Sequence, residues 1–236
     1  TLAETLQHVC DLQYPNFEVI VVNDGSTDNC AEIAVGFPVR LISVENGGLS
    51  RARNLGAEAA TGEIVAYIDD DAYPDPHWLH YLALEFLEHP NHAGVGGPNL
   101  PPVGDGRIAQ AVANSPGGPL EVLVTDREAE HIPGCNCAFR RDRLLAIGGF
   151  DPTFRTAGDD VDFCWRLMDQ GWTIGYHPSA LVWHHRRNSV KTFLKQQRGY
   201  GIAEALLERK HPDRYNLLGH VTWKGRVYGK GVWQVL

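Results

Sequence analysis

Three consecutive carboxylates, Asp69, Asp70 and Asp71, are the group of side chains in this sequence most suited to chemistry. They directly follow residues 63–68, a short apolar segment that predicts a buried strand. Adjacent negative charges repel one another, and the repulsion lowers stability unless a cation compensates it. Hard divalent cations prefer oxygen ligands and commonly bridge carboxylates to the phosphates of a substrate. The triplet therefore predicts a cation site, with a solvated acidic loop as the structural alternative.

A second acidic group lies at residues 158–163, where a helix is predicted to begin. Asp159 or Asp160 can face the positive end of the helix dipole, which is their simplest structural role. One of these carboxylates could instead act as a general base on an acceptor hydroxyl. For Asp162 we favour the role at the helix start.

A basic group follows the predicted strand 180–183, in the order His184, His185, Arg186 and Arg187. Imidazole is a common metal ligand, and arginine can neutralise a departing pyrophosphate. A polar surface position is the alternative for a histidine that follows a strand. The doublet of histidines beside arginines, in an acidic chain, favours the functional interpretation.

The elements that must position these groups alternate between strand and helix patterns. Strands are predicted at 17–22, 39–44, 63–68, 93–97, 135–139, 173–176 and 180–183. Helices are predicted at 1–12, 49–60, 76–89, 142–147, 159–170 and 190–210, and a shorter one ends near residue 35. The segment 98–118 is rich in glycine and proline and predicts a long loop. Alternation of this kind predicts βαβ units and a parallel sheet.

Ligands of open α/β sheets bind beyond the carboxyl ends of the strands. Asp24 and the triplet Asp69–Asp71 both lie at such ends. Asp24 precedes a helix, so its carboxylate can accept hydrogen bonds from a nucleobase or a ribose. An N-cap or Asx-turn role is the structural alternative at this position.

Composition narrows the class of protein. The chain has 236 residues, 43% of them hydrophobic and 21% charged, as in a soluble globular protein. A net charge of −8 argues against nucleic acid as a partner. The five cysteines form neither a disulfide framework nor a zinc motif, which favours a reducing compartment. We expect a cytoplasmic protein, including one at the cytoplasmic face of a membrane, with any membrane segment lying outside this chain.

Six motifs occur along the chain, at residues 21–28, 46–56, 69–71, 149–151, 158–166 and 182–184. Taken together, these motifs resemble those of the family 2 glycosyltransferases, in the same order and over about residues 1–190. This resemblance implies an α/β fold of the GT-A type: a Rossmann-like, mostly parallel central sheet flanked by helices, with a small additional antiparallel sheet. It also implies transfer of a sugar from a nucleotide-diphosphate donor, UDP by default, to a hydroxyl of a glycan, lipid or other acceptor.

The resemblance also implies roles on the donor side. Asp24 resembles the aspartate that contacts the base of the nucleotide. Arg51 and Asn54 lie in the stretch that approaches the nucleotide and diphosphate, and Asp69 resembles the residue near the ribose and sugar.

On the metal and catalytic side, Asp71 resembles the metal-binding aspartate of the DxD motif, and His184 a histidine that completes the metal site in some members. The metal is Mn²⁺ or Mg²⁺. Asp160 matches the catalytic base of an inverting mechanism, and Asp159 stands where the family more often has glutamate.

The same comparison suggests a domain organisation. Residues 1–190 are expected to form the catalytic domain, and 191–236 a C-terminal helical extension packed on it. The strand that usually precedes the first helix of the family is missing, either because the chain comes from a longer protein or because the protein lacks this strand, and without it an incomplete base pocket is expected. Residues 195–200 lack the Gln-x-x-Arg-Trp pattern of processive members, which favours single addition. A non-catalytic member of the fold and an aspartate-dependent phosphoryl-transfer enzyme are the alternatives.

Overall fold

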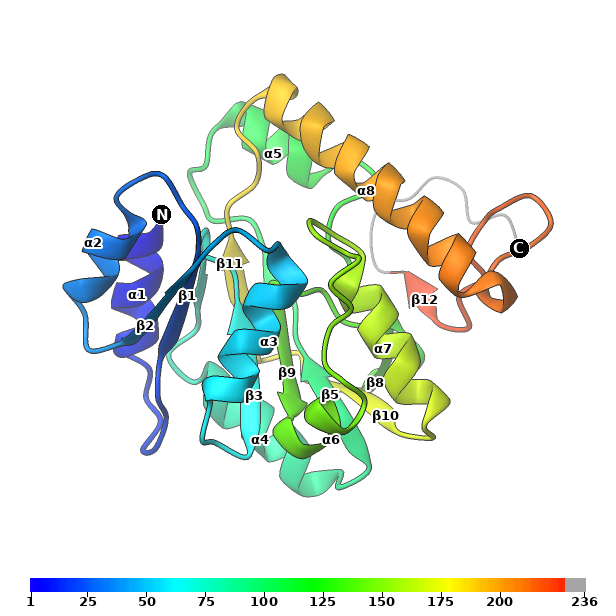
Figure 1. The fold of residues 1–236 in the computed structure, drawn as a ribbon. Helices are drawn as coiled ribbons and strands as arrows, with labels where there is room; N and C mark the ends of the chain where they lie inside the picture. The colour runs from blue at the N-terminus through cyan, green and yellow to red at the C-terminus, as the bar shows by residue number, and fades with distance from the viewer. Residues whose placement is uncertain (228–236) are drawn as a thin grey trace.

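The computed structural model describes residues 1–227 (Figure 1). The helices are α1 Leu2–Cys10, α2 Cys30–Val35, α3 Leu49–Ala59, α4 Trp78–Glu88, α5 Arg107–Ala113, α6 Arg141–Ala146, α7 Asp159–Asp169, α8 Val190–Lys210 and the 3₁₀ turn η1 Pro212–Arg214. The strands are β1 Ile20–Asp24, β2 Arg40–Val44, β3 Ile64–Ile68, β4 Ala72–Pro74, β5 His92–Gly96, β6 Asn99–Leu100, β7 Val122–Leu123, β8 Glu128–His131, β9 Asn136–Arg140, β10 Thr173–Tyr176, β11 Val182–His184 and β12 Arg226–Val227.

The largest sheet has seven strands in the order β12-β7-β8-β10-β5-β9-β3. Strands β3, β5, β10 and β7 run in one direction, and β9, β8 and β12 run in the other. The expected mostly parallel sheet is therefore present in the sense that β3, β5, β10 and β7 share one direction. Direct pairing is more often antiparallel, because β9 lies between β3 and β5. Among the described strands of this sheet, only β5 and β10 are parallel neighbours.

Two smaller sheets complete the strand pairing. Strands β1 and β2 form a parallel pair of their own. Strands β4, β11 and β6 form a three-stranded sheet, in which β11 pairs antiparallel with β4 and parallel with β6. The small additional sheet expected from the sequence is present, but its strand directions are mixed.

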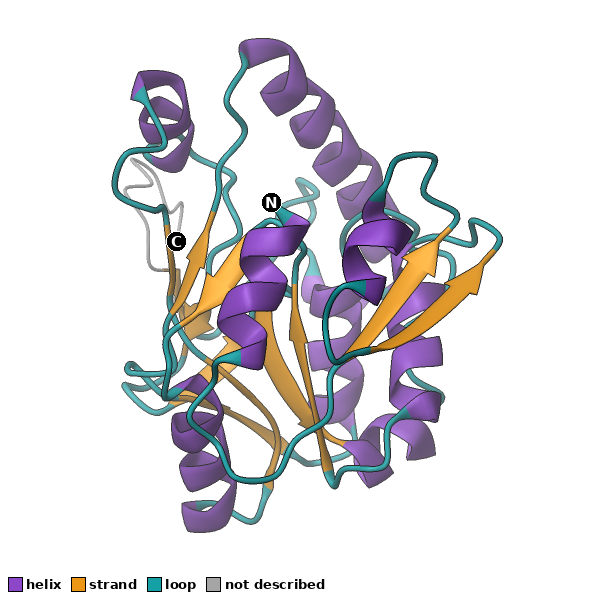
Figure 2. Ribbon diagram, turned by 90° about the vertical axis from the view of Figure 1, so that its left-hand side faces the viewer, coloured by secondary structure: helices purple, strands orange, loops and turns teal. Residues whose placement is uncertain are grey.

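Helices lie on both sides of the large sheet (Figure 2). Strand β9 shows why, because its side chains alternate between two cores. Cys137 and Phe139 join the core that contains side chains of α3, α6 and α7, and Ala138 joins the core that contains side chains of α4. The sheet is thus buried on both faces, and the loops at the ends of its strands are left to form a site.

Helix α8 lies across the carboxyl ends of the strands (Figure 1). It begins at the cap Ser189, whose hydroxyl accepts a hydrogen bond from the amide of Thr192 at 3.2 Å. Leu207 packs with Phe154 and Trp165 in a small core of its own. After η1 the chain returns to the large sheet, where β12 pairs with β7. The described part of the expected C-terminal extension is therefore not only helical, and 228–236 lie outside the described residues.

The predicted elements are otherwise present with small shifts, and two segments differ. The predicted loop 98–118 contains β6 and the helix α5, and the strand predicted at 17–22 begins at Ile20 instead. Within residues 1–227, no helix combines the length and apolar character that crossing a membrane requires.

Candidate active site

Strand pairing brings Asp69, Asp71 and His184 together. Asp69 directly follows β3, and β4 begins right after Asp71. The register of β4 with β11 places His184 opposite Ala72. As a result Nε2 of His184 lies 3.1 Å from Oδ1 of Asp71 and 3.9 Å from Oδ2 of Asp69. Asp70 does not belong to this group, and its main-chain carbonyl accepts a hydrogen bond from the Thr5 hydroxyl at 3.0 Å.

Two arginines contact this acidic group. Nη1 of Arg187 lies 2.9 Å from Oδ2 of Asp71, and Nη1 of Arg186 donates to Nδ1 of His184 at 2.9 Å. Burial on its own raises the pKa of Asp71, but the hydrogen bonds from His184 and Arg187 and the charge of Arg187 outweigh it, so the pKa lies below its ordinary value. Asp71 is therefore ionised at neutral pH.

The donor set fits a hard or borderline divalent cation. One oxygen from each of Asp69 and Asp71 and one nitrogen of His184 all lie within 4.8 Å of one another. Two carboxylates and one imidazole suit Mn²⁺, and the carboxylates alone suit Mg²⁺. Because a guanidinium can only donate, Nδ1 of His184 accepts from Arg186 and Nε2 carries the proton of the neutral ring. His184 can serve as a ligand through Nε2 only after Arg186 has released Nδ1.

Arg53 connects this group to the second acidic group. Its side chain is buried, forms an ion pair with Asp159 and lies 3.6 Å from Oδ1 of Asp69. Its Nη2 also donates to the carbonyl of Gly134 at 3.1 Å. Burial raises the pKa of Asp159 to about 6, against the opposing charge of Arg53. One buried guanidinium thus holds Asp69 and Asp159, which are far apart in the sequence, together at one end of the sheet.

Asp160, the predicted base, lies at the start of α7 against the segment that precedes β9. Its Oδ2 accepts from the amide of Gly134 at 2.9 Å and lies 3.5 Å from Nε2 of His131. His131 is oriented through Nδ1, which donates to the carbonyl of Leu120 at 3.0 Å. Burial on its own raises the pKa of Asp160, but His131, Arg53 and the Gly134 amide hold the pKa well below its usual range. The Asp160 carboxylate is therefore ionised and fixed in orientation.

Tyr200 belongs to α8, and its phenol responds to the second acidic group. Burial, and then the charge of Asp160, raise the pKa of Tyr200 to about 12. The phenol therefore stays protonated at neutral pH.

Asp24 has a local structural role in the protein alone, in addition to the contact with the base of a nucleotide that is predicted for it. Its Oδ1 and Oδ2 accept hydrogen bonds from the amides of Gly47 and Gly48, at 2.7 and 2.8 Å. The side chain of Asn46 donates to its carbonyl and to its carboxylate. Gly48 adopts a φ of 96°, in the region that favours glycine. Asp24 therefore anchors the loop that leads into α3, and is neither an N-cap nor an Asx turn.

The structure does not bring Arg51 and Asn54 into contact with the carboxylates. Arg51 is exposed, and its Nη1 donates to the carbonyl of Glu45 at 3.2 Å. Both ends of the Asn54 amide bind the backbone of Phe150, at 2.8 Å each. Asn54 thus fixes the Gly149–Phe150 turn against α3.

Sequence reasoning missed Arg53, His131, Gly134 and Tyr200. Arg53 lies between Arg51 and Asn54 on α3. The available signal was an arginine at a position where the helical spacing from Ser50 and Ala57 predicts burial. His131 and Gly134 lie in a stretch with no recognisable motif, so only the folded structure reveals them.

Comparison with known proteins decides the family. The sequence model of glycosyl transferase family 2 matches residues 1–148. The chain belongs to glycosyl transferase family 2. The family 2 chain is 30% identical over 208 residues to the pre-mycofactocin glycosyltransferase of Mycobacterium tuberculosis, an alignment that covers 83% of this chain and 43% of that protein. It is 29% identical over 204 residues to the glucosyl-dolichyl phosphate glucuronosyltransferase of Haloferax volcanii, covering 78% and 64%. The family 2 chain therefore spans less than two thirds of the length of either relative.

Solved structures confirm the GT-A fold of the family 2 chain. The mannosyltransferase PcManGT from Pyrobaculum calidifontis, in complex with GDP-Man and Mn²⁺, superposes with a TM-score of 0.65 at 23% identity, over 88% of this chain and 60% of that one. S. aureus TarS 1–349 in complex with UDP-GlcNAc gives a TM-score of 0.60 at 20% identity, over 80% and 55%. At these identities the likeness supports the fold alone.

Proposed function

We propose that this chain is the catalytic part of an inverting glycosyltransferase, which moves a sugar from a nucleotide-diphosphate donor to an acceptor hydroxyl. The observation that carries the proposal is the convergence of two acidic groups at one end of the sheet. Asp69, Asp71 and His184 form one group, and Asp160 lies in the other, joined to the first through Arg53. A cation site beside an oriented carboxylate is the arrangement that this reaction needs.

The donor is assigned to the side of Asp69 and Asp71. A divalent cation, Mn²⁺ or Mg²⁺, would be held by these carboxylates and supply charge stabilisation for the departing diphosphate. Two solved neighbours support a nucleotide sugar with Mn²⁺, since one contains GDP-Man with Mn²⁺ and another UDP and GalNAc with Mn²⁺. UDP is the nucleotide proposed for the donor of this chain, as in the UDP and UDP-GlcNAc complexes of other neighbours.

The residues of the first half would shape the nucleotide pocket. Asp24 would act at the base and hold the loop 46–48, whose backbone then faces the donor with a fixed geometry. The exposed guanidinium of Arg51 is free to turn toward a phosphate, because its present acceptor is a single carbonyl. Asn54 would act indirectly, by fixing the Phe150 backbone. Asp69 would face the ribose and sugar.

Asp160 would remove the proton of the acceptor hydroxyl as that oxygen attacks the anomeric carbon. Its carboxylate is ionised, and the contacts with Gly134 and His131 leave it little freedom to turn. Transfer from the opposite face of the sugar inverts the anomeric centre. The hydroxyl's proton passes to the carboxylate, and the nucleoside diphosphate leaves with the electron pair of the broken bond.

We further propose that the acceptor is a glycan, a lipid or a related conjugate at the cytoplasmic face of a membrane. The names of relatives support this class, since one acts on glucosyl-dolichyl phosphate and another is a poly-β-1,6-N-acetyl-D-glucosamine synthase of Staphylococcus epidermidis. Helix α8 and the segment 98–118 border the site and would contact the acceptor. In this proposal 1–190 form the catalytic domain, and the segment from 191 onward packs on it.

Asp160→Asn tests the proposal directly. A panel of nucleotide sugars with Mn²⁺ first identifies the donor by thermal shift, and product formation is then measured with that donor. We expect Asp160→Asn to lower turnover by about 10²–10⁴-fold, as for loss of general-base catalysis, and to keep donor binding. Asp126→Asn, in an exposed turn, is the matched control and should retain full turnover. Wild-type turnover in Asp160→Asn would remove this residue as the base.

A further inference from the structure

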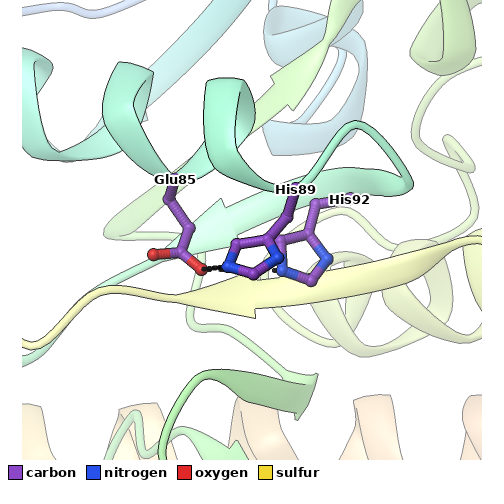
Figure 3. A group of neighbouring side chains, drawn as sticks. All are labelled: Glu85, His89 and His92. Carbon is purple, nitrogen blue, oxygen red and sulfur yellow. Dashed lines mark ion pairs between the residues drawn. The ribbon is translucent and has the colours of Figure 1, made fainter.

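A second group of potential ligands lies at the far end of the sheet from the acidic site. Glu85 belongs to the last turn of α4, His89 directly follows that helix, and His92 is the first residue of β5. Because β3 and β5 run in the same direction, the start of β5 and the end of β3, where Asp69 lies, are at opposite ends of the sheet. Figure 3 shows the carboxylate and both imidazole rings turned toward a common point.

The spacing of the three side chains fits a bridging ion better than a hydrogen bond. Oε1 of Glu85 lies 3.5 Å from Nε2 of His89 and 3.6 Å from Nε2 of His92. These distances exceed the usual range for an N–H···O hydrogen bond, about 2.7–3.2 Å. Ligands at about 2.0–2.2 Å from a tetrahedral Zn²⁺ are separated from each other by about 3.4 Å. The observed gaps are close to that separation.

Two of the three ligand atoms have no other partner. Oε1 of Glu85 and Nε2 of His92 are buried and accept or donate no hydrogen bond among the described residues. Glu85 is fully buried, and His92 is 3% exposed. Buried polar atoms are nearly always paired, so two unpaired atoms that face each other indicate a ligand between them. An ion pair of Glu85 with His89, one helical turn apart, would not explain why His92 points to the same place.

The outer atoms of the group are held as metal ligands usually are. Nδ1 of His92 lies 2.7 Å from the hydroxyl of Thr173, and Oε2 of Glu85 lies 3.1 Å from Nη1 of Arg127. With Nδ1–H donating to Thr173, the lone pair of His92 is on Nε2, toward the other two ligands.

We propose that Glu85, His89 and His92 form a metal site, separate from the acidic site, that takes a first-row transition cation such as Zn²⁺. Two imidazoles and one carboxylate suit this class of ion, and His89, which is 45% exposed, leaves room for a water as fourth ligand. The ion ties the end of α4 to the start of β5. Its function is structural, because the site lies away from the carboxylates that are assigned to sugar transfer.

The test uses Zn²⁺ alone and a protein in which the other candidate site is weakened. In the His184→Gln protein, we expect one equivalent of Zn²⁺ to bind, as measured by competition with a chromogenic indicator. Zn²⁺ at 100 times its Kd should raise the Tm by roughly 5–10 °C. Adding His89→Gln should weaken binding at least tenfold and abolish the shift. Adding His80→Gln, an exposed histidine elsewhere on α4, should change neither.

Two results would overturn the proposal. One is equal Zn²⁺ affinity in the His89→Gln and His80→Gln proteins. The other is no stoichiometric Zn²⁺ in the His184→Gln protein at all. Because His89 is partly exposed, its substitution should leave folding intact, which unfolding in urea without metal would verify. Glu85→Gln gives an independent second variant, with the same shape and no charge, and should also lose the ion.

Discussion

Arg53 is the residue whose removal should report most clearly on how the two acidic groups are held together. Arg53→Met keeps the apolar stem of the side chain but lacks the guanidinium group, whose carbon lies 5.4 Å from the centre of the Phe150 ring. It removes the ion pair with Asp159 and the hydrogen bond to the Gly134 carbonyl. Asp159, with 2% of its side chain exposed, is then left as a buried carboxylate without a counterion.

Removing one partner of a buried ion pair costs about 3–5 kcal/mol. Protonation of Asp159 limits this cost. A carboxyl with an ordinary pKa of 3.8 can be protonated at pH 7 for about 4 kcal/mol, at 1.36 kcal/mol per pH unit. The penalty for burying Asp159 without a counterion cannot exceed this cost, because protonation is the alternative. Loss of Arg53 raises the folded-state pKa of Asp159 further, so the folded variant binds a proton that the unfolded chain does not. The loss of stability should therefore grow as pH rises from 6 to 8, by up to about 1.4 kcal/mol per unit.

Urea unfolding of wild type and Arg53→Met at pH 6, 7 and 8 measures both quantities. Arg51→Met, an exposed arginine on the same helix, is the control and should change stability by less than about 0.5 kcal/mol. Adding Asp159→Leu to Arg53→Met should restore most of the loss, because no unpaired charge remains. A loss below about 1 kcal/mol at pH 8, or one that does not vary with pH, would refute the account of Arg53 as the counterion of a buried carboxylate.

Two further predictions concern packing and charge. A Cβ on Gly97 would lie 2.0 Å from the carbonyl oxygen of Ala180, so Gly97→Ala should lower the free energy of unfolding by more than about 2 kcal/mol, whereas Gly118→Ala, in open space, should have little effect in the same urea titration. Burial on its own raises the pKa of Asp151, but Lys210 and a backbone amide lower it to about 2, so Asp151→Asn, which leaves the pair of Lys210 with Asp162 in place, should cost roughly 1 kcal/mol at pH 7 after screening. This contribution is present above pH 4 and is lost as pH falls toward 2, so an Asp151→Asn defect that is unchanged at pH 3 would contradict the assignment.

Elements with a strong local signal could be predicted from the sequence. Helix α8 begins and ends where the amphipathic pattern predicts, at Val190 and Lys210, and its cap Ser189 is a typical helix start. Strands β7 and β12 could not be predicted, because each is two residues long and exists only through pairing between distant segments. Helix α5 was hidden by the glycine and proline residues that surround it.

The candidate site likewise contains residues that could be predicted from local motifs and residues that could not. Asp71 and His184 were predicted as partners from motifs, and the structure brings them to 3.1 Å. The local roles of Asp24 and Asn54 could not be predicted, because their partners are backbone groups 23 and 96 residues away. Arg53 was passed over for a similar reason, since nothing near it in the sequence reveals that Asp159 lies beside it. A side chain that binds distant backbone, or whose charge is buried against a distant partner, leaves no recognisable pattern in the neighbouring sequence.

The contact between Arg186 and Nδ1 of His184 would make the binding of the proposed ion and donor cooperative. An ion on Nε2 needs the tautomer in which Nδ1 carries the proton, and that tautomer cannot accept from Arg186. Ion coordination by His184 and the Arg186 contact therefore exclude each other, and each weakens the other by the same factor. A donor whose diphosphate draws Arg186 away removes this competition and tightens the ion by that factor. Ion and donor would then favour each other's binding through an arginine that never touches the ion.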